Sequence, residues 1–154
     1  MISVLVLMTQ AVPLPADLPE CDEAAAEQGI QQDMNICAYR DFLIADAALN
    51  AQWKVTRAKM KARDAGWESY KPDYDTRPGW FASLLEAQRA WLTYRDAQCR
   101  VDGYTARGGS LEPLLVSTCK TALTKARTQD LKTGSRSRTI GLVAVFCHHE
   151  SDQL

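Results

Sequence analysis

The longest stretch of this chain without glycine or proline lies between Gly29 and Gly66, and its apolar residues recur every three or four positions. That recurrence follows one face of an α-helix, which completes a turn every 3.6 residues. The sequence therefore predicts a long amphipathic helix that starts after Gly29 and ends at about Asp64. Its apolar face is formed by Met34, Ala38, Phe42, Ala45, Leu49, Trp53 and Met60, with Thr56 in the one gap.

Two further segments show a helical pattern. Residues 81–99 are rich in alanine, leucine, arginine and glutamine, which are good helix formers. Glycines at 103, 108 and 109 interrupt the pattern, and the adjacent pair is typical of a turn that needs a positive φ. Ser110, with Glu112 and Pro113 after it, predicts an N-cap and a third helix from about Leu111 or Glu112 to Lys132. Its expected apolar stripe is Leu115, Cys119, Ala122, Leu123 and Ala126.

One side of the second helix mixes apolar and polar residues. Its members are Leu84, Gln88, Trp91, Leu92, Arg95 and Cys99. Burying Gln88 and Arg95 requires partners, because an unpaired buried polar group costs about 1–3 kcal/mol. We expect Arg95 to pair with an acid of the first helix, such as Asp46. The alternative is that Gln88 and Arg95 open onto a cleft.

The chain has five cysteines, at positions 21, 37, 99, 119 and 147, and no CxxC pair. This spacing argues against a zinc ribbon or a thioredoxin-like redox pair. In an oxidising compartment disulfides are the expected use, and four bridging cysteines allow three connectivities. We favour Cys99 with Cys119, which flank a glycine-bearing loop, and Cys21 with Cys37 by elimination; the other connectivities stay open. The expected fold is all-α, a small antiparallel bundle of three to four helices stapled by disulfides.

The two ends of the chain differ from its helical middle. Residues 1–16 carry no charge and place a short apolar run, Ile2 to Met8, before the stretch AVPLPA. This pattern predicts a truncated export signal, and hence a periplasmic or secreted protein; the alternative is an N-terminal arm. We assign residues 17–132 to the helical domain and residues 133–154 to a C-terminal extension. Spanning a membrane takes about 20 apolar residues, so no stable membrane insertion is expected.

Charge is unevenly distributed along the chain. Residues 17–50 hold eight acids and one base, a net charge of −7, whereas the residues from Ala51 onward hold eleven acids and seventeen bases, a net charge of +6. Either the acidic stretch folds against the basic one, or it leaves an acidic face for a basic partner. The overall net charge of −1 argues against a general nucleic-acid binder.

No residue pattern nominates an enzyme. The two histidines, His148 and His149, are adjacent near the C-terminus, so no separated Ser/His/Asp or Cys/His arrangement can be proposed. With Cys147 and Glu150 they make a poor metal site, because adjacent side chains point in different directions. We expect no catalytic residue, no metal and no cofactor.

Four segments resemble a known family when taken in order: MNICAYRDFLIADAALNAQW (34–53), LLEAQRAWLTYRDAQC (84–99), GGS at 108, and CKTALTKARTQDL (119–131). Over about residues 21–132 the chain resembles the LprI-type lysozyme inhibitors, which are small exported bacterial helical domains. The resemblance implies a non-catalytic binding protein whose partner is lysozyme or a related cell-wall hydrolase. The alternative is an envelope module that binds another protein or a cell-wall fragment.

Two loops are candidates for the binding surface, because Tyr, Trp and Arg are common interface anchors. Residues 103–113 contribute Tyr104 and Arg107, and residues 66–79 contribute Trp67, Tyr70 and Tyr74. We expect the second loop to be ordered by packing of its own side chains, the alternative being a plain crossover between helices. Animal-type lysozymes are strongly basic, so Asp22, Glu23 and Glu27 are expected to steer such a partner toward the protein.

Overall fold

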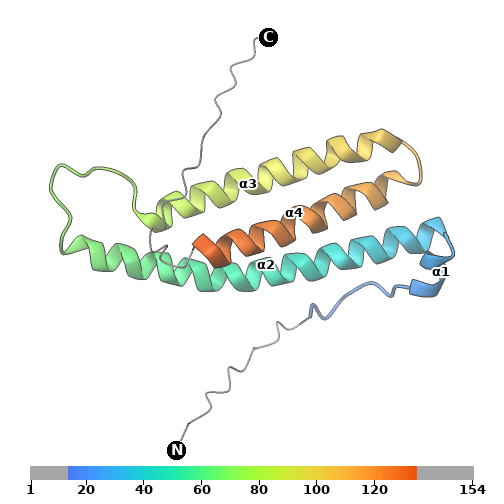
Figure 1. The fold of residues 1–154 in the computed structure, drawn as a ribbon, viewed down its shortest axis with the longest axis horizontal. Helices are drawn as coiled ribbons and strands as arrows, with labels where there is room; N and C mark the ends of the chain where they lie inside the picture. The colour runs from blue at the N-terminus through green and yellow to red at the C-terminus, as the bar shows by residue number, and fades with distance from the viewer. Residues whose placement is uncertain (1–13, 135–154) are drawn as a thin grey trace, which may run out of the picture.

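A computed structural model of the chain describes residues 14–134, which form a bundle of helices (Figure 1). The helices are α1 (Glu23–Glu27), α2 (Gln31–Glu68), α3 (Trp80–Gly103) and α4 (Glu112–Gly134), and a 3₁₀ turn, η1 (Tyr104–Ala106), follows α3. Residues 14–134 contain no strand. The all-α bundle predicted from the sequence is confirmed.

Some of the sequence predictions lie outside the described residues. They concern nearly all of the export signal predicted for residues 1–16, the C-terminal extension beyond Gly134, and the group Cys147, His148, His149 and Glu150. Between residues 14 and 134, no helix combines the length and the apolar character needed to cross a membrane.

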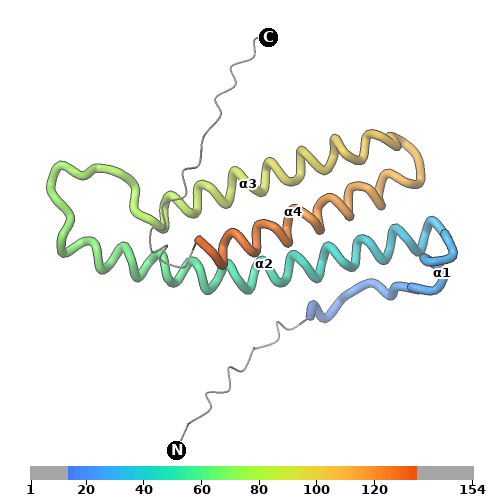
Figure 2. The backbone as a smooth tube through the Cα atoms, in the orientation of Figure 1, coloured from blue at the N-terminus to red at the C-terminus, as the bar shows by residue number. Residues whose placement is uncertain are grey.

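The three long helices run up, down and up, so that α2 and α4 are parallel to each other and antiparallel to α3 (Figures 1 and 2). Two hydrogen bonds show the register of the parallel pair. Asn35 Nδ2 donates to the Ser110 carbonyl at 2.9 Å, and Thr56 Oγ1 donates to the Leu131 carbonyl at 3.2 Å, each across a separation of 75 residues. The register is therefore constant along the two helices.

The long helices differ in length, and this shapes the two ends of the bundle. At 1.5 Å per residue, the 38 residues of α2 span about 57 Å, whereas the 23 residues of α4 span about 35 Å. Both start at the same end of the bundle (Figure 1). Within residues 14–134, the last turns of α2 therefore have only α3 and the connecting loop beside them.

The core between the helices combines a few apolar side chains with hydroxyl groups. The apolar members are Ala45, Leu49, Met60, Cys99 and Leu131, and the hydroxyl members are Thr56, Ser117, Thr124 and Thr128. Threonine can be buried here because its hydroxyl finds a carbonyl nearby, as when Thr128 Oγ1 donates to the Thr124 carbonyl at 2.9 Å. On α2, the predicted face is confirmed at Ala45, Leu49, Thr56 and Met60.

The predicted apolar stripe of α4 is partly wrong. Ala122 and Ala126 are exposed, and the buried face instead carries Ser117, Thr124, Thr128 and Leu131. The reason is that the hydroxyl groups of Thr124 and Thr128 make hydrogen bonds inside the bundle, so apolarity alone does not identify the buried face. On α3, Leu92 is exposed rather than part of the buried side.

The glycines of the α3–α4 connection interrupt the helical pattern where the sequence predicted it. Helix α3 ends at Gly103, where the sequence predicted a break; a Cβ atom there would lie 2.5 Å from Val116 Cγ2, so Gly103 also permits close packing of α3 on α4. The positive φ expected of the glycine pair is found at Gly108, where φ is 76°. The predicted N-cap at Ser110 is wrong, because α4 begins at Glu112 and Leu111 is the residue before it. The Ser110 carbonyl instead accepts a hydrogen bond from Asn35 Nδ2.

The start of α3 is capped by an acid from α2. Asp64 accepts hydrogen bonds from the backbone N–H groups of Trp80, at 2.7 Å, and Phe81, at 3.0 Å. These are donors that a helix N-terminus cannot satisfy by itself. A Cβ atom on Gly79 would lie 2.6 Å from Asp64 Oδ1, so glycine at this position leaves room for the cap.

Replacing Gly79 by alanine should therefore displace the Asp64 carboxylate from the start of α3. We expect Gly79→Ala to lower the free energy of unfolding by about 0.5–2 kcal/mol, the usual worth of an N-cap. Urea denaturation of the oxidised protein, followed by circular dichroism, measures the change.

Gly66→Ala is the matched control, because Gly66 lies within α2 and a Cβ atom there would meet nothing within 4 Å. This variant should be neutral or more stable by up to about 1 kcal/mol, since alanine favours helix over glycine. Equal effects of the two substitutions would contradict the role assigned to Gly79.

Candidate functional site

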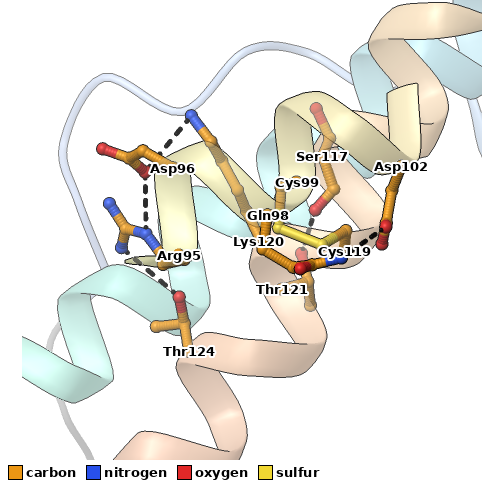
Figure 3. Close-up of a disulfide and its surroundings, with 10 residues drawn as sticks. All are labelled: Arg95, Asp96, Gln98, Cys99, Asp102, Ser117, Cys119, Lys120, Thr121 and Thr124. Atoms are coloured by element: carbon orange, nitrogen blue, oxygen red, sulfur yellow. Dashed lines mark hydrogen bonds and ion pairs between the residues drawn. A yellow bond between two sulfur atoms is a disulfide. The ribbon is translucent and has the colours of Figure 1, made fainter. Parts of the chain in front are cut away.

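Both disulfides lie at the end of the bundle where α2 and α4 begin, which we call the disulfide end. Cys21–Cys37 joins the segment before α1 to α2, with a Cα–Cα distance of 5.0 Å. Cys99–Cys119 joins the last turns of α3 to α4, with a Cα–Cα distance of 5.4 Å (Figure 3). The structure thus contains both of the pairs favoured from the sequence, and the second closes the α3–α4 connection into a short covalent ring.

About one helical turn before Cys99, Arg95 of α3 is buried and contacts both α2 and α4. Its Nη1 donates to Asp46 Oδ1 on α2 at 3.1 Å and to Thr124 Oγ1 on α4 at 3.4 Å. Its Nε donates to Asp96 Oδ1 at 3.0 Å (Figure 3). The predicted Arg95–Asp46 pair is confirmed.

Aromatic rings and a second polar pair surround this arginine. The guanidinium carbon lies 5.2 Å from the centre of the Phe42 ring and 5.3 Å from that of Trp91, distances typical of cation–π contacts. The second polar pair joins the same two helices: Arg127 Nε on α4 donates to Gln88 Oε1 on α3 at 3.0 Å. Gln88 and Arg95 are thus buried with partners, and the alternative that they open onto a cleft is wrong.

The α3–α4 connection presents Tyr104 and Arg107 at the disulfide end. The guanidinium carbon of Arg107 lies 4.6 Å from the centre of the Tyr104 ring, and both side chains are exposed. Two contacts hold the connection on either side: Gly108 N–H donates to Glu112 Oε2 at 2.7 Å, and Asn35 donates to the Ser110 carbonyl. Tyr104 and Arg107 therefore form a pre-organised pair on a braced turn.

The acids proposed for steering lie at the same end of the bundle, on and just before α1. Asp22 also has a structural role, because its Oδ1 accepts a hydrogen bond from Ala25 N–H at 2.9 Å and caps α1. Glu23 Oε1 lies 3.9 Å from Arg40 Nη1, and the Glu27 side chain is exposed. Asp46 is the acid of residues 17–50 that pairs with the basic part of the chain. Most of the others are exposed, so the acidic charge of residues 17–50 lies mainly at the surface.

The structure does not bring the two predicted loops together. Trp67, at the end of α2, and Tyr70 and Tyr74, in the loop that follows, lie at the opposite end of α3 from Tyr104 (Figure 1). The 24 residues of α3 separate the two ends by about 36 Å. Tyr70 and Tyr74 are 78% and 85% exposed, so packing of the loop by these two rings is not found.

Other contacts order this end of the molecule. The Trp67 and Trp80 rings meet edge to face with their centres 6.0 Å apart. Beside them is an open groove of about 760 Å³, whose lining consists of Asp64, Trp67, Glu68, Lys71, Asp75, Arg77, Pro78, Gly79, Trp80 and Ser83. We call it the tryptophan groove. Trp80 was not among the predicted site residues, because it follows the loop and its place beside Trp67 depends on a contact between two helices.

Asp75 and Arg77 form an ion pair on one wall of the groove. Asp75 accepts hydrogen bonds from Arg77 Nε at 2.8 Å, Arg77 Nη2 at 2.9 Å and the Arg77 backbone N–H at 3.2 Å. Hydrogen bonds from the Arg77 side chain, then from its backbone, favour the charged carboxylate and lower the pKa of Asp75 from 3.8 to about 2. The pair also raises the pKa of Arg77.

This pair predicts how the loop responds to acid. The pKa of Asp75 is lower in the folded protein, so its contribution to stability is present above pH 3.8 and is lost as the pH falls through about 2. NMR titration of the Asp75 carboxyl carbon should give a midpoint at about pH 2, and Arg77→Gln should return it toward 3.8. A wild-type midpoint near 3.8 would disprove the pairing in solution.

A second prediction concerns the buried arginine. Arg95→Met keeps much of the side-chain volume but removes the bonds to Asp46, Asp96 and Thr124 together. We expect a loss of about 2–4 kcal/mol in the free energy of unfolding, measured by urea denaturation.

Arg89→Met on the same helix is the control for this measurement, because Arg89 is exposed. It should change the free energy of unfolding by no more than about 0.5 kcal/mol. Equal losses in both variants would show that Arg95 has no special role.

Within residues 14–134, the structure has no group of three or more histidine, cysteine or acidic side chains arranged to hold a metal ion. Two surfaces of the described residues are candidates for function: the disulfide end, and the tryptophan groove at the other end.

Comparison with known proteins identifies the family. The model of the family described as lysozyme inhibitor LprI matches residues 21–131. An uncharacterized protein of Rhizobium meliloti (strain 1021) is 40% identical over 131 residues, which cover 85% of this chain and 89% of that protein. No solved structure matches the chain. A family of inhibitors implies a non-catalytic protein, and with two disulfides it points to an extracytoplasmic location. The chain belongs to the LprI lysozyme inhibitor family.

Proposed function

We propose that this protein is exported to the periplasm or secreted, and that it inhibits lysozyme or a related cell-wall hydrolase by binding through its disulfide end. Membership of the LprI family supports the choice of partner. The observation that carries the choice of surface is the exposed Tyr104–Arg107 pair on a turn closed by Cys99–Cys119.

Inhibition by occlusion requires a rigid element that stays in the substrate cleft of the hydrolase. A turn that is already ordered loses little conformational freedom on binding, so more of its contact energy appears as affinity. The Cys99–Cys119 bridge, the Glu112 contact and the Asn35 contact provide this order. Tyrosine and arginine are also the residue types most often found as binding anchors.

The acidic face adds a long-range attraction to a basic hydrolase. Asp22, Glu23 and Glu27 are exposed on the first short helix and its cap, at the same end as Tyr104. Charges arranged in this way raise the rate of encounter, and their effect falls as salt screens them. In this proposal Trp67, Tyr70 and Tyr74 are not part of the inhibitory surface, because they lie at the far end of the bundle.

Lysis of a cell-wall suspension by an animal-type lysozyme, titrated with the oxidised protein, tests the proposal. We expect dose-dependent inhibition that is lost on reduction of the disulfides and an association rate that falls steeply with ionic strength. Tyr104→Ala or Arg107→Ala should raise the half-inhibitory concentration about tenfold or more, as for a residue worth at least about 1.4 kcal/mol.

Tyr74→Ala is the matched control, since it removes an exposed tyrosine from the opposite end and should change inhibition less than about twofold. Loss of inhibition in Tyr74→Ala but not in Tyr104→Ala would contradict the proposal, because it would place the inhibitory surface at the opposite end of the bundle. Absence of inhibition by the unaltered protein, against lysozymes and bacterial cell-wall hydrolases alike, would refute the function.

A further inference from the structure

The tryptophan groove lies at the end of the bundle where the loop 69–79 joins α2 to α3. It has no role in the proposed inhibition. It is formed by the last turns of α2, the loop 69–79 and the first turn of α3. Its volume of about 760 Å³ falls in the range of sites that hold small ligands. Trp67 and Trp80 are 37% and 42% exposed, and the guanidinium carbon of Arg63 lies 5.9 Å from the centre of the Trp80 ring, so part of each ring is open to a ligand.

Three sets of contacts hold the groove in shape. Asp64 caps α3 from α2, and Gly79 allows this approach. The Trp67 and Trp80 rings brace each other, and Asp75 binds Arg77 within the loop. A site with this many fixed contacts is largely formed before a ligand arrives, which lowers the cost of binding.

The chemistry of the lining selects the kind of ligand. Apart from the two tryptophans, Pro78 and Gly79, the lining residues are charged or hydroxyl-bearing, and there is no leucine, isoleucine, valine or methionine. Such a surface suits a polar molecule that has a flat apolar face, rather than an acyl chain. Its three acids against two bases, Lys71 and Arg77, also disfavour a nucleic acid or an anionic lipid surface.

We propose that the tryptophan groove binds a short oligosaccharide carrying N-acetyl groups, of the kind found in cell-wall glycan. The indole rings offer apolar surface to the C–H face of a sugar ring and to the methyl of the N-acetyl group. Glu68 accepts hydrogen bonds from hydroxyl or amide groups, while Lys71 and Ser83 donate them. Within residues 14–134, Glu68 and Lys71 make no ion pair, so both are available to a ligand.

This inference goes beyond the inhibitor function, because it uses the other end of the bundle. The two ends are about 36 Å apart along α3, so a glycan in the groove leaves the Tyr104–Arg107 turn free. The protein then holds the substrate of a hydrolase at one end and the hydrolase at the other.

NMR titration of the full oxidised chain with tetra-N-acetylchitotetraose tests the proposal. The chain has four tryptophans, at 53, 67, 80 and 91, whose indole N–H signals report separately. We expect the signals of Trp67 and Trp80 to shift in a saturable way, while those of Trp53 and Trp91 stay in place. Trp67→Ala and Trp80→Ala should each weaken binding at least tenfold by calorimetry, and Glu68→Gln should weaken it severalfold.

Tyr104→Ala is the control variant and should bind the sugar within twofold of the unaltered protein. The Trp80→Ala variant should keep its helical circular dichroism, because the backbone N–H that Asp64 binds is retained. Lysozyme inhibition measured on a small soluble substrate should be unchanged in Trp80→Ala, which separates a failure of the groove from a failure of the inhibitor proposal.

Three results would overturn the proposal. The first is absence of saturable shifts with tetra-N-acetylchitotetraose and with soluble peptidoglycan fragments. The second is a shift of all four indole signals that survives in Trp67→Ala and Trp80→Ala, which would show non-specific contact. The third is binding to phosphatidylglycerol vesicles, dependent on Trp67 and Trp80, without sugar binding, which would make this end a membrane-surface site.

Discussion

The buried guanidinium of Arg95 is the interaction on which the arrangement of the three long helices depends. A charge removed from water needs partners in fixed directions, because one left unpaired costs several kcal/mol. Here the partners are Asp46 on α2, Thr124 on α4 and Asp96 on α3 itself, while Phe42 and Trp91 flank the group. Sliding any helix along its neighbours by one turn would break at least one of these bonds. The apolar core is small and contains several hydroxyls, so directional contacts of this kind set the register that apolar packing would otherwise set.

The two ends of the bundle are stabilised in different ways. At the disulfide end, Cys21–Cys37 and Cys99–Cys119 constrain the short α1 and the α3–α4 turn, which bury few large side chains of their own. At the other end, the connection between α2 and α3 depends on the Asp64 cap, the tryptophan pair and the Asp75–Arg77 ion pair. Covalent bonds therefore hold the end proposed to enter a hydrolase, and reversible contacts hold the end proposed to take up a small ligand.

Local patterns in the sequence predicted α2 and α3, since the apolar spacing and the absence of helix breakers act over a few turns. The Arg95–Asp46 pair was also predictable, because a charged residue on a buried stripe must find a partner. The buried face of α4 was not, since Thr124 and Thr128 are polar by residue type and yet satisfy their hydrogen bonds within the bundle. The Asp64 cap and the place of Trp80 beside Trp67 depend on contacts between two helices, and no spacing along the chain indicates them.

Within residues 14–134, the difference in length between α2 and α4 leaves three long helices side by side at one end of the bundle and two at the other. The two helices keep a constant register, so Gly134 at the end of α4 lies beside about residue 59 of α2. Within residues 14–134, the remaining turns of α2 meet only α3 and the loop, and two helices side by side leave a groove that a third would fill. Had α4 matched α2 in length, its side chains would cover Trp67 and Trp80. A shorter third helix thus gives the bundle an aromatic groove without weakening the Arg95 cluster, which lies where all three helices are present.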